Sequence, residues 1–214
     1  QVLDSFPGQA GIRLDLAGMY FSAGLTPNAM SEVDHARVTA PDHPRAAYLQ
    51  ALAALERAPD GQNYQQAVAL LEAVVRTAPA SQEYRLALAL AYQRLGETEP
   101  MAAPFPVTRN PGQDPDSLAY RSWWLATIGD SAAAQKLRDQ LFQQGDQGPG
   151  RAFRLALVAQ GLGRTEAANL ALTDARKNAD PRLLWPVTRL VFAAEPAMRQ
   201  LSAEWQNALQ SQGE

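Results

Sequence analysis

The sequence feature that most constrains the fold is a glycine that recurs at a nearly constant interval. Gly96, Gly129 and Gly163 are separated by 33 and 34 residues. Each of them ends one segment with apolar residues at helical spacing and precedes another such segment. A period of this length is typical of helix-turn-helix units that stack on their neighbours. The chain is therefore expected to be all-α.

Alanine, which accounts for 40 of the 214 residues, recurs at fixed places around these glycines. The two helices of each unit must cross closely, and a larger side chain at the crossing would hold them apart. Each glycine is expected to take the left-handed conformation that ends the first helix. The alanines expected at the crossings are Ala17, Ala36, Ala89, Ala156 and Ala175.

Polar residues mark several expected helix starts. Asp114 and Asp130 each stand where a side chain can cap the N-terminus of the helix that follows. Thr26 and Thr165 are expected to cap two further helices in the same way, and another helix is expected to start around Gly148. The spacing of apolar residues and the residues that mark helix starts and ends thus indicate the same helical segments.

The order of these residues resembles the pattern of the tetratricopeptide repeat family. That pattern has small and apolar residues, a turn glycine, a small residue followed four positions later by a large one, and a closing proline. The resemblance covers nearly the whole chain. It implies a right-handed α-solenoid of helix pairs, a single domain over residues 1–214 that ends in a C-terminal capping helix. The repeats are expected at roughly 10–43, 44–81, 82–114, 115–148 and 149–182, and the cap at 183–214, with Met198, Leu201 and Trp205 on the apolar face of its last helix.

One expected repeat lacks a regular second helix. Pro104, Pro106 and Pro111 fall in the segment 98–111, and three prolines at this spacing cannot share a regular helix. A short turn followed by an extended, strand-like stretch is expected instead. The segment is interpreted either as a decayed repeat or as a hinge or flap that binds a partner.

The resemblance also implies a binding surface. In tetratricopeptide arrays fixed positions of the first helix of each pair line a concave face, which here would be apolar and aromatic. Such a groove suits a protein or peptide segment as partner. The alternative is that these side chains form the core of a tightly wound solenoid. The residues concerned are Leu14, Phe21, Tyr48, Leu52, Leu90, Arg94, Trp123 and Phe153.

Composition argues against several kinds of chemistry. The chain has no cysteine and a formal net charge of −3, so a thiol nucleophile is excluded and nucleic-acid binding is not favoured. His35 and His43, the two histidines, each follow an aspartate, and we interpret them as helix-surface and capping residues. No apolar run approaches the roughly 20 residues needed to span a membrane. An enzyme, a cofactor and a metal site are not expected.

The degenerate repeats are similar to those of bacterial envelope proteins, including scaffolds of exopolysaccharide synthesis and export. The resemblance implies a non-catalytic scaffold, periplasmic rather than cytoplasmic. Two alternatives stay open at this point: the sensory half of a transcription regulator, and the substrate-recognition domain of a transferase. The residues upstream of Gln1 would distinguish these three functions.

Overall fold

The computed structural model describes residues 9–57, 61–97, 114–145, 148 and 150–211. Over these residues the chain forms eleven α-helices and no β-strand, which confirms the expected all-α fold. The segment 98–111, expected to contain the interrupted helix, lies outside the described residues.

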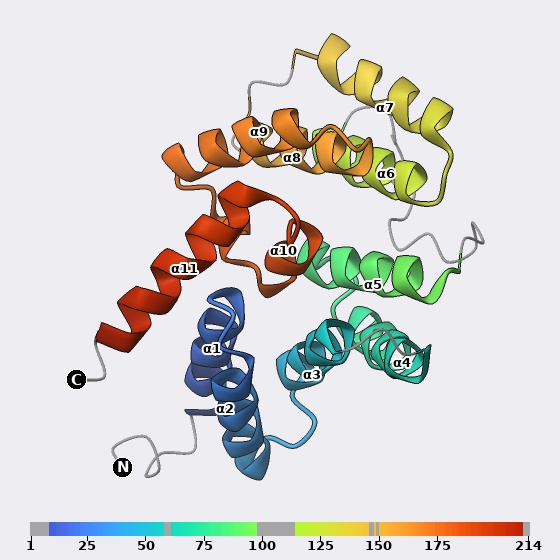
Figure 1. Ribbon diagram of the computed structural model, residues 1–214. Coiled ribbons are helices and arrows are strands. Elements are labelled where there is room, and N and C mark those ends of the chain that lie inside the picture. The colour runs from blue at the N-terminus through green and yellow to red at the C-terminus, as the bar shows by residue number, and fades with distance from the viewer. Residues whose placement is uncertain (1–8, 58–60, 98–113, 146–147, 149, 212–214) are drawn as a thin grey trace. The chain divides into compact units, whose positions relative to one another are not determined.

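Most of the helices pair with the next helix along the chain (Figure 1). In chain order α1 packs against α2, α3 against α4, α6 against α7, and α8 against α9. Their bounds are α1 Gln9–Ser22, α2 Thr26–Thr39, α3 Pro44–Glu56, α4 Gly61–Thr77, α5 Gln82–Leu95, α6 Pro115–Thr127, α7 Ser131–Gln143, α8 Arg151–Gly161 and α9 Thr165–Lys177. A 3₁₀ helix, Pro181–Leu184, then precedes α10, Pro186–Val191, and α11, Pro196–Ser211.

The contacts group the chain into two compact units. The first comprises Gln1–Leu95, Leu184–Val191 and Gln200–Glu214, and the second comprises Gly96–Leu183 and Phe192–Arg199. Each unit joins segments that are distant in the sequence, since α10 packs against α1, α3 and α5 within the first unit. The expectation of a single domain over residues 1–214 therefore stays a prediction.

The recurring glycines end their helices as expected. Gly129 and Gly163 have φ values of +94° and +68°, a region in which other residues are strained. After Gly163 the Arg164 amide donates to the carbonyl of Ala159 at 2.8 Å, and Asp130 makes the equivalent 2.9 Å bond after Gly129. These are Schellman-type bonds that satisfy carbonyls at the end of the helix. All five alanines expected at the crossings are fully buried: Ala17, Ala36, Ala89, Ala156 and Ala175.

Two of the expected helix caps are confirmed and two are wrong. The Asp114 carboxylate accepts from the amides of Asp116 and Ser117, and Asp130 accepts from the amide of Ala133. Thr26 and Thr165 do not cap, because each is the first residue inside its helix and the preceding residue forms no side-chain cap.

The helix expected around Gly148 begins three residues later, at Arg151. Gly150 precedes it with a φ of +83°. The last helix begins at Pro196, and Met198 and Leu201 on its expected apolar face are buried, while Trp205 is half-buried. The apolar face expected for the last helix is thus confirmed at these positions.

Candidate functional site

The groove expected from the sequence is closed in the first unit. Leu14, Phe21, Tyr48 and Leu52 are completely buried, and Leu90 is nearly so. These residues lie on α1, α3 and α5, and the short helix α10 packs against all three helices. The expectation of an open partner-binding groove at these residues is corrected here: they form the core of the unit.

Specific polar contacts hold α10 in this place. The Val187 amide donates to the Tyr48 hydroxyl at 3.2 Å. The Arg189 guanidinium lies 4.5 Å from the centre of the Phe21 ring and donates to the Glu56 carboxylate at 2.7 Å. Removing an apolar helical face from water stabilises the fold, and here α10 of the same chain covers the apolar face of α1, α3 and α5.

The remaining residues expected in the groove also form contacts within the protein. Trp123 is 1% exposed, and its Nε1 donates to Gln160 at 2.6 Å. Phe153 is buried with the Phe192 ring at 6.0 Å in an edge-to-face arrangement. Arg94 is half-buried and donates to the carbonyl of Leu55 at 2.7 Å, which ties α5 to α3. Of the eight expected groove residues, the second unit contains Trp123 and Phe153, and the first unit contains Leu14, Phe21, Tyr48, Leu52, Leu90 and Arg94.

Glu56 makes the stability of this closed face depend on pH. Burial raises the pKa of the Glu56 carboxyl, but hydrogen bonds from Arg189 and Thr26 outweigh burial, and the pKa lies below its ordinary value. A carboxylate whose pKa is lowered by folding stabilises the folded state above the unfolded pKa of about 4.3. That stabilisation is lost as the pH falls through the folded pKa.

Glu56→Gln is therefore expected to melt below the wild type at about pH 7, with the two melting temperatures converging as the pH falls toward about 3. Thermal unfolding followed by circular dichroism at several pH values measures this convergence. Melting curves that stay separated by the same amount at every pH would show that the Glu56 carboxylate makes no such contribution.

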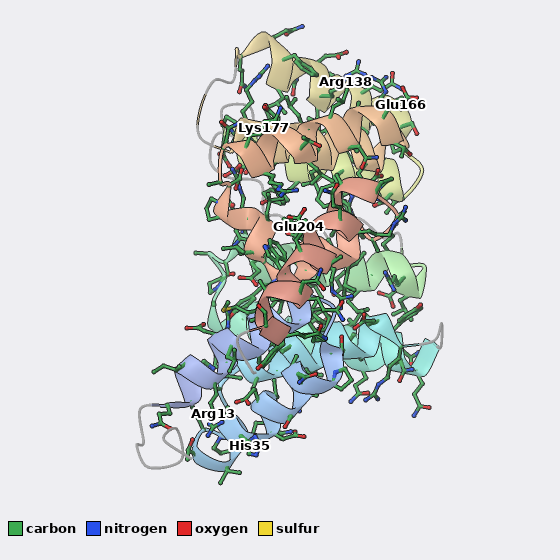
Figure 2. The ribbon with its side chains drawn as sticks, turned by 60° about the vertical axis from the view of Figure 1, so that its left-hand side comes forward. Arg13, His35, Arg138, Glu166, Lys177 and Glu204 are labelled. Carbon is green, nitrogen blue, oxygen red and sulfur yellow. The ribbon has the colours of Figure 1, made fainter. Side chains whose placement is uncertain are left out.

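The two histidines occupy the structural roles expected for them. His43 precedes α3, and its Nδ1 accepts from the amide of Arg45 at 3.2 Å, so it caps this helix. His35 lies on the exposed face of α2 (Figure 2). Within the described part of the chain, no three histidine or carboxylate side chains gather where they could hold a metal ion.

A buried titratable cluster on α3 and α5 belongs to the same closed face. Burial raises the pKa of Glu83, and the Tyr48 hydrogen bond and the charge of Arg45 act in the opposite direction. A carboxyl with a raised pKa can serve as a general acid. Tyr48 on α3, its hydrogen-bond partner, is fully buried, and Glu83 on α5 is half-buried, so the pair forms a polar contact between α3 and α5.

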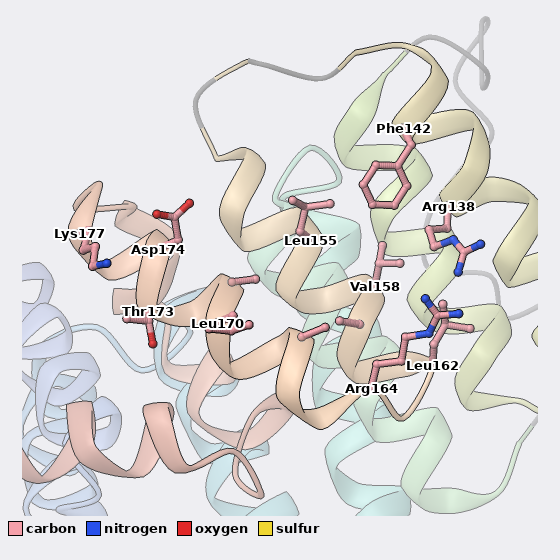
Figure 3. Close-up of a pocket in the computed structure, with 13 residues that line it drawn as sticks. Arg138, Phe142, Leu155, Val158, Leu162, Arg164, Leu170, Thr173, Asp174 and Lys177 are labelled. Atoms are coloured by element: carbon pink, nitrogen blue, oxygen red, sulfur yellow. The ribbon is translucent and has the colours of Figure 1, made fainter.

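An open apolar groove lies instead in the second unit, on α7, α8 and α9 (Figure 3). Its volume is about 540 Å³. The floor is one face of α8, because its residues recur at intervals of three and four. They are Leu155, Val158 and Ala159, with Leu162 directly after the end of the helix.

The walls of the groove carry large apolar side chains that face solvent. Leu170 on α9 is 73% exposed and Phe142 on α7 is 54% exposed. The inward face of α9 is formed by Ala168, Leu172 and Ala175, which are buried. Leu170 therefore lies outside the face through which α9 packs against the rest of its unit.

Charged residues lie at both ends of the groove. Figure 3 shows Arg138 and Arg164 at one end, and Asp174 and Lys177 at the other. Arg138 forms an ion pair with the neighbouring Asp139 at 2.6 Å. Neither Arg164 nor Lys177 forms an ion pair with any residue in the described ranges.

Sequence reasoning missed this groove because the resemblance directs attention to the first helix of each pair. The walls here belong to α7 and α9, the second helices of their pairs. One available signal is the position of Leu170, which falls outside the spacing of Ala168, Leu172 and Ala175.

The chain matches no known protein family, no curated protein and no solved structure. The tetratricopeptide resemblance therefore stays an interpretation of the sequence pattern. None of the described helices is both long enough and apolar enough to cross a membrane.

Proposed function

We propose that this chain is a non-catalytic protein-interaction module built from tetratricopeptide-like helix pairs in a right-handed solenoid. In this proposal the groove of α7, α8 and α9 receives a segment of a protein partner. The pairing of successive helices and the left-handed glycines between them support the architecture. The bacterial envelope assembly, of the kind used in exopolysaccharide synthesis or export, and the periplasmic location are part of this proposal and rest on the sequence resemblance.

The observation that carries the binding proposal is the concentration of exposed apolar surface in one concavity. Single exposed apolar residues are ordinary, whereas a contiguous apolar concavity with a polar rim is typical of an interaction site. Covering a side chain such as Leu170 stabilises a complex by about 1.5–3 kcal/mol. The groove of α7, α8 and α9 has the apolar area and the open access that a partner needs.

The test places a photo-crosslinking amino acid at position 170 of the full chain in the cells that produce it. We expect crosslinks to one protein segment, identified by mass spectrometry. The matched control is position 38, because Val38 is an aliphatic residue on α2 that is 82% exposed and lies outside the groove. Crosslinks to lipid or to small molecules, or no specific product at position 170, would contradict the proposal.

A pair of substitutions gives the affinity. Leu170→Gln is expected to weaken binding of the crosslinked segment by about tenfold or more, while Val38→Gln leaves it unchanged. Both side chains are exposed, so both variants are expected to melt within about 0.5 kcal/mol of the wild type. Equal affinities for the two variants would place the partner elsewhere on the surface.

A further inference from the structure

The shape and chemistry of the groove restrict the kind of segment that it can bind. Its lining residues run along α9 from Arg164, which directly precedes the helix, to Lys177, and at 1.5 Å per residue this corresponds to roughly 20 Å. The floor runs along α8 from Leu155 to Leu162. The site is therefore a long trough between two helical walls.

Along most of their length the walls and floor offer no backbone hydrogen bonds to a partner. Apart from Leu162 and Arg164, which lie in the turn between α8 and α9, the lining residues are on the sides of α-helices, whose N–H and C=O groups bond within the helix. An extended peptide in this trough would bury its own backbone groups without partners, which is costly. A helical segment satisfies its backbone internally and presents only side chains, as in other helix-in-groove complexes.

The charges of the rim favour a partner with carboxylates. The lining residues include Arg138, Arg164 and Lys177 and one carboxylate, Asp174. Arg138 is paired with Asp139, so Arg164 and Lys177 are the lining cations without an ion pair among the described residues. Arg164 also adjoins the N-terminus of α9, where the helix dipole adds positive potential and Glu166 in the first turn adds a negative charge. Arg164 and Lys177 stand at opposite ends of the trough, so the cationic side chains frame the apolar floor (Figure 3).

We propose that the occupant of the groove is an amphipathic α-helix of a protein partner, with its apolar stripe on α8 and its carboxylates beside Arg164, Arg138 and Lys177. This inference rests on the proposed function and adds to it the conformation and the charge of the partner segment. An acyl chain has no polar face to turn toward the solvent that reaches Leu170, which is 73% exposed, whereas an amphipathic helix has one.

The test uses three synthetic peptides of about 18 residues that share one leucine stripe at i, i+3, i+4 and i+7 and differ in the flanking residues. These are Glu in the first peptide, Gln in the second and Lys in the third. We expect the Glu peptide to bind the full chain about tenfold more tightly than the Gln peptide and the Lys peptide to bind most weakly, with the difference shrinking at high salt. Fluorescence anisotropy measures the three affinities.

Charge reversal in the protein provides the decisive comparison. The double variant Arg164→Glu and Lys177→Glu is expected to bind the Lys peptide more tightly than the Glu peptide. The matched control is Arg37→Glu with Arg76→Glu, which makes the same change in net charge at exposed residues of α2 and α4 and should keep the preference for the Glu peptide. Melting curves of both double variants establish that they are folded.

The outcomes separate this inference from the proposed function. Equal binding of the three peptides, or no binding of any of them, overturns the inference, while protein crosslinks from position 170 would still uphold the interaction module. Binding of oleate below its micellar concentration with higher affinity than the Glu peptide would assign the groove to lipids and overturn the inference. Loss of the protein crosslinks would overturn the proposed function itself.

Discussion

Trp123→Ala is expected to lower the free energy of unfolding by about 3–5 kcal/mol, because it removes a large buried side chain and leaves a cavity. Trp123 on α6 is almost completely buried, and its indole Nε1–H bonds to Gln160 of α8. The helices α6 and α8 are in close contact at this point, since a side chain at Gly161 would come within 3.0 Å of Trp123. The tight contact limits how far the site can collapse.

Denaturant unfolding of the full chain, followed by circular dichroism, measures this loss. Phe142→Ala is the matched control in the same unit, because Phe142 is an aromatic residue that faces solvent, and its loss is expected to change stability by no more than about 0.5 kcal/mol. Unchanged stability of Trp123→Ala, together with weaker partner binding, would restore the sequence-based assignment of Trp123 to an open groove.

Arg182→Met is the second substitution with a large expected effect. Arg182 is buried and donates to Asp116 at 2.9 Å and to Asp180 at 3.0 and 3.1 Å. Asp180 is buried as well, and without Arg182 it would retain a charge with no cation beside it. Breaking a buried pair in this way costs about 3–5 kcal/mol. Asp116 keeps its second ion pair, with Arg154 at 2.9 Å.

Two further variants test whether the loss comes from the unpaired charge. Adding Asp180→Asn to Arg182→Met is expected to restore part of the stability, because the asparagine removes the buried charge and its side-chain oxygen can still accept from the backbone amide of residue 182. Arg138→Met, which breaks the more exposed pair with Asp139, is expected to cost less than about 1 kcal/mol. Equal losses of stability for Arg182→Met and Arg138→Met would mean that the buried network of Arg182 stabilises the protein no more than the exposed pair does.

The open groove and the closed face lead to different interpretations of similar residues. Tyr48 on α3 and Leu170 on α9 are both large side chains on helices, yet the first is covered by α10 and the second faces solvent. Substitution of Tyr48 should therefore act mainly on stability, and substitution of Leu170 mainly on binding. Measuring both properties for both residues separates the core from the interaction surface.

The sequence by itself determined the local structure of this protein. The spacing of Gly129 and Gly163 and the buried alanines at positions such as 89 and 156 predicted helical units and the places where they turn, because these features depend on φ and on side-chain size. Asp114 and Asp130 predicted two helix starts for the same local reason.

Only the tertiary structure decided which apolar face is covered. The six-residue helix α10 closes the face of α1, α3 and α5, and nothing in the local pattern of Pro186–Val191 reveals where it packs. Likewise Arg182 meets Asp116 across 66 residues of sequence, in a space kept open by Gly150, where a side chain would collide with the guanidinium. Periodicity shows that a helix has an apolar face, but contacts between distant segments determine whether that face becomes core or remains open to a partner.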